Sequence, residues 1–191
     1  MYSPPDSDSV PRPSLRVEKL IAAFGVLQVS LFLGFAIYRL TPVAVNTWLD
    51  GSLSQAQRLL FVGWVAMNLY TEGYRGFHKR FCPRVVSRAV QLGRDPRPLD
   101  VLLALPFCMS LIRATRRQLI ARWTFVTALY TMIYFVRKLP MTWRGIIDGG
   151  VVVGLAYGVV SLWWIYSQYA IGRLELLPAV APEPRTDVAV L

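Results

Sequence analysis

Histidine and cysteine are nearly absent from this chain. His78 is the one histidine, and Cys82 and Cys108 are the two cysteines among 191 residues. A zinc or haem site draws on several such ligands, and a di-iron site needs histidines together with carboxylates. Two cysteines also make no disulfide framework. The sequence therefore predicts no metal site.

Motifs for nucleotide binding and acyl transfer are missing as well. The chain contains no P-loop, no GxGxxG and no GxSxG pattern. Serine catalysis would have only His78 available as an imidazole base. We therefore expect no cofactor, and the missing constellations favour a protein that is not an enzyme.

Acidic residues are scarce beside basic ones. The chain has 11 Asp and Glu against 21 Lys and Arg, which gives a net charge of +10. Its charged fraction is 17%, whereas soluble domains carry about 25%. The basic residues sit between apolar segments, a placement typical of contact with anionic lipid headgroups. We expect membrane lipids, and not nucleic acid, as partners.

Long apolar segments are abundant, and 54% of the residues are hydrophobic. The clearest runs from Ile146 to Tyr169, with Trp143 near one edge and Trp163 and Trp164 near the other. A helix of ~20 apolar residues crosses a bilayer core of ~30 Å, and tryptophans prefer its two boundaries. The sequence predicts an all-α integral membrane protein with spans at about 20–40, 59–74, 119–136 and 146–169.

Other segments are expected to lie beside these spans. Pro42 should end the first helix, and Pro83 should interrupt the second. Residues 84–92 read as an amphipathic helix in the membrane interface. Residues 99–112 are too few for an ordinary span and favour a re-entrant element. The helical domain covers 16–172, between tails at 1–15 and 173–191 that we expect to be disordered.

Two topologies compete. Four spans plus the re-entrant segment place both chain ends and most basic residues inside, whereas five spans move the C-terminus and more basic residues outside. Because basic loops stay on the cytoplasmic side, we prefer four spans. The expected location is an inner or plasma membrane with a cytoplasmic N-terminus.

Three glycines repeat every fourth residue in the last span, at Gly150, Gly154 and Gly158. Small residues at this spacing form a ridge on which another helix packs closely. The ridge predicts helix packing within the chain or between copies, so a protein partner or a homo-oligomer through the last helix is one expectation.

The run from Glu72 to Arg80 is the best chemical candidate. Glu72, Arg75 and Lys79 should share a helix face, and His78 lies on the same helix. The bland alternative is a set of anchors at the end of a span. The residues expected to bind lipid or phosphate are Arg75, Lys79, Arg80, Arg84, Arg88, Arg113, Arg116 and Arg117.

Three functions follow, in order of preference. The first is a non-catalytic subunit or scaffold that packs through the glycine ridge and binds anionic lipid or an acidic partner through a basic cytoplasmic face. The second is a membrane enzyme acting on a lipid or polyprenyl phosphate, with Glu72 and His78 moving protons and Arg75, Lys79 and Arg80 holding phosphate. The third is a transporter or channel component, for which no inverted repeat is visible.

Overall fold

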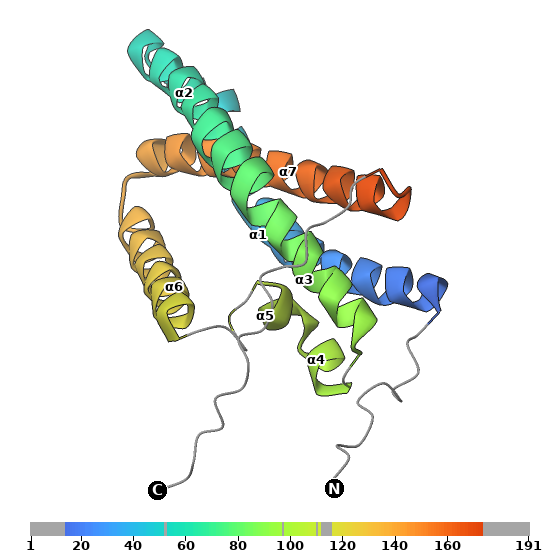
Figure 1. Ribbon diagram of the computed structural model, residues 1–191. Coiled ribbons are helices and arrows are strands. Elements are labelled where there is room, and N and C mark those ends of the chain that lie inside the picture. Colours follow the sequence, from blue (N-terminus) through green and yellow to red (C-terminus); the bar gives the residue numbers. More distant parts are fainter. Residues whose placement is uncertain (1–13, 52, 97, 110, 112–115, 174–191) are drawn as a thin grey trace, which may run out of the picture.

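The structure is a computed structural model that describes residues 14–51, 53–96, 98–109, 111 and 116–173 (Figure 1). All regular structure in these ranges is helical, as the sequence predicts, and they contain no strand. In chain order the helices are α1 (Leu15–Leu49), α2 (Gln55–Asn68), η1 (Leu69–Phe81), α3 (Cys82–Arg94), α4 (Pro98–Leu102), α5 (Ala104–Cys108), α6 (Arg116–Val136) and α7 (Met141–Ala170).

Three long segments form the bundle. Helices α2, η1 and α3 follow one another without a break and make one rod, residues 55–94, which packs with α1 and α7. The rod runs antiparallel to α1, because the Phe61 ring contacts the Trp48 ring at one end and Arg94 binds Glu18 at the other. Figure 1 shows the rod, in cyan to green, crossing over α7, in orange.

The hydrophobic core lies where α1, α3, α5 and α7 meet. Its members come from four segments far apart in sequence, so burying them holds the bundle together. The fully buried side chains are aliphatic or thiol groups, and the largest are Val26, Val29, Cys82, Val85, Val86, Leu92, Cys108 and Leu162.

The face of α7 toward the rod is built from glycine. A Cβ on Gly150 would lie 2.6 Å from Trp64, and one on Gly158 would lie 2.6 Å from Phe77. Gly154 faces the Glu72 side chain in the same way, at 3.2 Å. The ridge of Gly150, Gly154 and Gly158 is thus covered by the chain's own rod, and these glycines are buried.

Pro42 does not end the first helix, contrary to the expectation from sequence. Helix α1 continues through it to Leu49. Proline removes one backbone N–H and favours a break, but packing beyond it opposes one. Ala44 and Thr47 are buried, and Thr47 lies directly against Gly145 of α7. These contacts hold the last two turns in helical form. Pro83 likewise leaves the rod continuous, since it occupies the first turn of α3.

The amphipathic segment 84–92 is also placed differently from the prediction. It is helical, as part of α3, but its apolar side enters the protein core and does not face a membrane interface. Val85, Val86, Ala89 and Val90 are buried against neighbouring helices. A helix with one strongly apolar face buries that face against a partner, and here the neighbouring helices are the partner.

Two short helices occupy the segment expected to be re-entrant. Helix α5 packs on α1 and α3, and Phe107 and Cys108 are buried there. The Leu105 N–H donates to Gln28 Oε1 at 2.9 Å, so an α1 side chain binds the start of α5. This element covers one end of the bundle.

Helix α6 stands apart from the bundle. Among the described residues it makes no substantial contact with another helix, and Figure 1 shows it, in yellow, to one side. Its exposed side chains are large and apolar, including Trp123, Tyr130 and Phe135.

Two helices are long and apolar enough to cross a membrane, α1 and α7. In its most apolar stretch, α1 is only 28% buried inside the protein, and α7 is 50% buried. A core helix of a soluble protein is mostly buried, so these two helices are compatible with a lipid environment.

Replacing Gly158 by leucine should destabilise the bundle, because the new side chain collides with Phe77. Overpacking of this kind costs about 1–3 kcal/mol of folding free energy. We expect a lower Tm for Gly158→Leu in detergent, measured by thermal unfolding. Gly34→Leu is the matched control, since nothing lies within 4 Å of a Cβ at Gly34. Equal Tm values for the two variants would contradict this packing.

Candidate functional site

The candidate site lies on η1, where the rod has π-helical geometry. The Cys82 N–H donates to the Phe77 carbonyl, five residues back. Gly73 and Gly76 lie inside this segment, and glycine is a weak helix former. Gly73 also faces Tyr157 of α7, which a Cβ would approach to 3.1 Å. π-Helical turns are rare and occur often at functional sites, which directs attention here.

The wider turn changes which side chains align. In a regular α-helix, the spacing of Tyr70, Tyr74, Phe77 and Phe81 would place the four rings in one row. Instead, Tyr70 stacks on Tyr74 and Tyr74 stacks on His78, with ring centroids 6.1 and 5.8 Å apart. The two phenylalanines form a separate edge-to-face pair. A π-helix has more residues per turn than an α-helix, so residues four apart align and the mixed three-and-four pattern fails.

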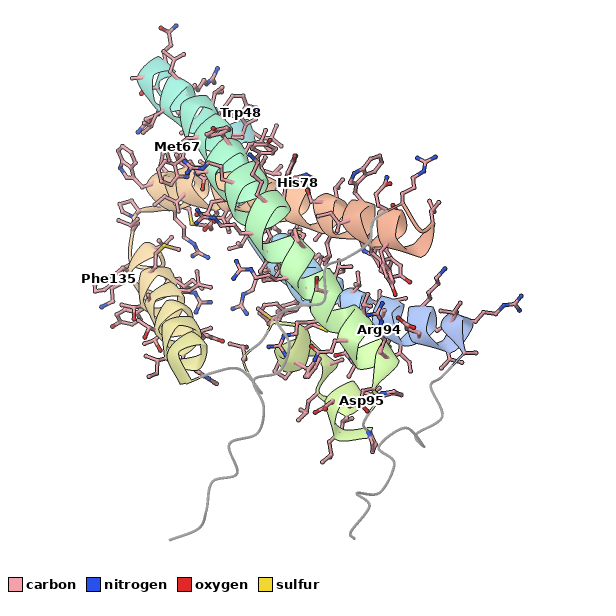
Figure 2. All side chains as sticks on the ribbon, in the orientation of Figure 1. Trp48, Met67, His78, Arg94, Asp95 and Phe135 are labelled. Carbon is pink, nitrogen blue, oxygen red and sulfur yellow. The ribbon has the colours of Figure 1, made fainter. Side chains whose placement is uncertain are left out.

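His78 faces α7. Its Nδ1 lies 3.2 Å from Ser161 Oγ, and its ring meets the edge of Tyr157. Figure 2 shows His78 where the rod crosses α7. Ser161 is only 4% exposed, so its hydroxyl is reached by the imidazole and not by solvent. The pair therefore joins two helices, and it does not present an open nucleophile.

Glu72 lies away from this pair. It packs over Gly154, seven residues before Ser161 on α7, which corresponds to about 10 Å along the helix axis. Glu72 and Arg75 are both exposed, and among the described residues neither forms an ion pair. The acid and the imidazole that the enzyme hypothesis requires are thus held at separate levels of α7.

Cations continue along the rod beyond His78. Lys79, Arg80 and Arg84 are exposed, and Lys79 Nζ lies 4.7 Å above the Tyr74 ring. Arg88 is half-buried, with its guanidinium 5.4 Å from the centre of the Phe107 ring. The ion pairs within the described part of the chain involve none of Lys79, Arg80 and Arg84. We call these three residues the basic stripe.

The second group of expected cations is not placed in detail. Arg113 lies outside the described residues, and only the backbone of Arg116 and Arg117 is described, at the start of α6. The tails expected at 1–15 and 173–191 lie almost wholly outside the described residues as well.

Sequence analysis missed a polar cluster that joins the ends of three helices. Glu18 of α1 is 8% exposed, and its Oε1 accepts from Arg94 Nε and from the Tyr169 hydroxyl, each at 2.9 Å. The hydrogen bond to Glu18 raises the pKa of Arg94. Lys19 Nζ donates to the Ala170 carbonyl nearby. The position of Glu18 near the start of an apolar helix was the feature of the sequence that could have indicated this cluster.

A second ion pair lies at the opposite end of α7. The i, i+4 spacing of Arg144 and Asp148 predicts a pair, and the structure confirms it at 3.5 Å. Asp148 is buried beside the glycines at the start of the α7 ridge. Asn68, a polar residue within the predicted second span, donates to the Trp64 carbonyl of its own helix.

Metal ligands do not converge anywhere in the described part of the chain. Cys82 and Cys108 are both buried free thiols. Comparison with known proteins gives no further guide, because no protein-family model, no curated protein and no solved structure matches the chain.

The His78–Ser161 contact should contribute to stability. His78→Phe leaves the buried Ser161 hydroxyl without its partner, and Ser161→Ala removes that hydroxyl. We expect each single variant to lose about 1 kcal/mol, and the double variant to lose less than their sum. Unfolding in detergent for all four proteins measures the coupling. Additive losses would mean that the two side chains do not interact.

Cys108 should be unreactive in the folded protein. Burial disfavours the charged thiolate and raises the pKa of this thiol to about 12. At pH 8 the thiolate fraction is then roughly one in ten thousand. In a Cys82→Ser background we expect water-soluble maleimide to modify Cys108 only after denaturation, and reactivity to rise as the pH approaches the raised pKa. Labelling at the rate of a free cysteine at pH 8 would contradict this burial.

Proposed function

We propose that this chain is a membrane-embedded, non-catalytic subunit or scaffold that binds anionic lipid headgroups through its basic stripe. The observation that carries the proposal is the position of Lys79, Arg80 and Arg84. These cations are exposed, they are without an acidic partner among the described residues, and they lie beside the aromatic end of α7.

The exposed apolar surface supports the membrane. Large apolar side chains of α1 and α6 are open to the surroundings, among them Leu20, Phe35, Ile120 and Phe135. Soluble monomers rarely expose such continuous apolar area. A lone helix as apolar as the described part of α6 would not stay separate in water, whereas lipid covers it without a protein partner.

The path of the chain supports four crossings. Helices α1, the rod and α7 each run between the end with Glu18 and the end with Arg144. Helix α5 packs beside Gly25 and Gln28, in the half of α1 that contains Glu18, and α7 begins at the Arg144 end, so we propose that α6 crosses between them. Its 21 residues reach about 30 Å, the thickness of a bilayer core. Helices α4 and α5 then stay at one side.

The position of the basic stripe along the length of α7 supports lipid headgroups as its ligand. Along the rod the stripe follows His78, which contacts Ser161, and precedes Arg94, which meets Tyr169 through Glu18. The part of α7 between these contacts carries Trp163 and Trp164, residues that favour the headgroup layer. Each cation near an anionic leaflet contributes about 1 kcal/mol.

The orientation in the membrane follows from the basic residues at the Glu18 end of the bundle. Arg16, Lys19 and Arg94 join the basic stripe there, close to the start of α1 and the end of α7. The positive-inside rule places this end in the cytoplasm, so we propose that the N-terminus faces the cytoplasm of an inner or plasma membrane.

The geometry gives less support to an enzyme. The Ser161 hydroxyl is closed off by the bundle, and Glu72 is separated from His78 along α7. A general acid or base must reach the proton it moves, and no described pair of such groups meets at an open surface. A transporter gains no support either. Helix α6 carries Thr124, Thr127 and Thr131, but it makes no substantial contact with the other described helices.

Removing the stripe should weaken the preference for anionic lipid. We expect Lys79→Gln/Arg80→Gln/Arg84→Gln to lose about 3 kcal/mol of headgroup attraction, roughly a hundredfold in affinity at low salt. Exchange of fluorescent phosphatidylserine against phosphatidylcholine in nanodiscs measures the preference. Arg58→Gln, at the far end of the rod, is the matched control. His78→Ala should also leave the preference unchanged, whereas an unchanged preference in the triple variant would overturn the proposal.

A further inference from the structure

We infer that the exposed side of η1 that is bounded by Glu72 and Arg75 binds the same side of a second copy of this chain within the membrane. The inference rests on the proposed membrane location but not on lipid binding by the basic stripe. It follows from the depth at which the structure holds these two charges and from the way they complement each other.

The depth is fixed by α7. Trp143 and Trp163 are 20 residues apart, about 30 Å along a helix, and this distance matches the hydrocarbon thickness. Gly154 lies near the middle of that interval. Because Glu72 packs directly over Gly154, its carboxylate belongs close to the midplane of the bilayer. The sequence placed this residue at the mouth of a span, where a charge is tolerated more easily.

Arg75 lies between the midplane and the headgroups. Gly73 contacts Tyr157 and Phe77 contacts Gly158, so Arg75 is held at the level of residues 157–158. The long cations further along the rod can extend to the headgroup layer, but a glutamate at the midplane is too short to do so. Charged groups at this depth face a protein interior or water in nearly all membrane proteins.

Within one chain these charges face outward. Glu72 and Arg75 are exposed, and neither has an ion-pair partner among the described residues. A pair formed only between the two would still leave the outer side of both groups in hydrocarbon. The face therefore requires a cover that supplies both a cation and an anion at matching depth.

A second copy meets this requirement. Two copies inserted in the same direction and related by a two-fold axis along the membrane normal hold their Glu72 side chains at one level. Each carboxylate then lies within one turn of the partner copy's arginine at position 75, so the symmetry gives two equal ion pairs. A lipid phosphate, by contrast, stays at the headgroup layer and does not reach Glu72.

Charge exchange tests the interface. In nanodiscs at low protein-to-lipid ratio, we expect the wild-type chain to be a dimer by single-molecule photobleaching. Glu72→Arg alone, or Arg75→Glu alone, should raise the dimer dissociation constant at least tenfold, because like charges then meet across the axis. Arg58→Glu makes the same charge change as Arg75→Glu outside the proposed interface and should leave the dimer unchanged.

Mixing the two single variants provides the decisive measurement. With different tags, Glu72→Arg and Arg75→Glu chains should form heterodimers, since arginines of one copy now face glutamates of the other. Such rescue excludes unfolding as the cause of the loss. A monomeric wild type, unchanged dimers in the single variants, or a failure of the mixture to pair would each overturn the inference.

The same samples separate this inference from the proposed function. If the single variants are monomeric and still prefer phosphatidylserine, lipid binding stands independently of the dimer, as we expect. A wild type that is monomeric with that preference intact overturns the dimer alone. A wild type that is monodisperse in buffer without detergent overturns both, since no bilayer would then surround η1.

Discussion

The close approach of the rod to α7 is the constraint on which the rest of the molecule depends. Glycines at positions 150, 154 and 158 remove the side chains that would hold the two helices apart, and Trp64, Glu72 and Phe77 of the rod occupy the space. In lipid, helices gain little from hydrophobic exclusion, so contact area and close packing must supply the attraction. The positions of Glu72, His78 and the basic stripe along α7 all follow from this one contact.

The helical class and the main apolar segments can be predicted from sequence, because length and composition alone decide whether a segment can cross a bilayer. The ion pair of Arg144 with Asp148 could be predicted too, since residues one turn apart meet in any helix. Both expectations depend on local spacing. They hold wherever the chain keeps regular α-helical geometry, which it does at the start of α7.

The expectations that failed depend on tertiary contacts. Pro42 is a helix breaker by its own chemistry, but burial of Thr47 beyond it keeps α1 intact. The apolar side of α3 has the pattern of an interfacial helix, and only the presence of α1 and α7 directs it into a core. The π-geometry of η1 shifts His78 into the tyrosine row, and an α-helical wheel cannot anticipate that shift.

Depth is the property that sequence spacing could not give and that matters most for function. Counted along the chain, the charged run from Glu72 to Arg80 follows a short apolar stretch and resembles the end of a span. Measured against α7, the run begins beside Gly154 and reaches Ser161, so it passes through about a third of the proposed hydrocarbon core. Glu72, at the start of the run, is then surrounded by the hydrocarbon core, whereas Lys79 and Arg80, at its end, approach the headgroup layer. In the proposed membrane, Lys79 and Arg80 lie at the level of lipid phosphates, whereas Glu72 lies where only a charged or polar protein surface could cover it. The proposed lipid-binding edge and the proposed dimer contact therefore occupy different depths of one helix.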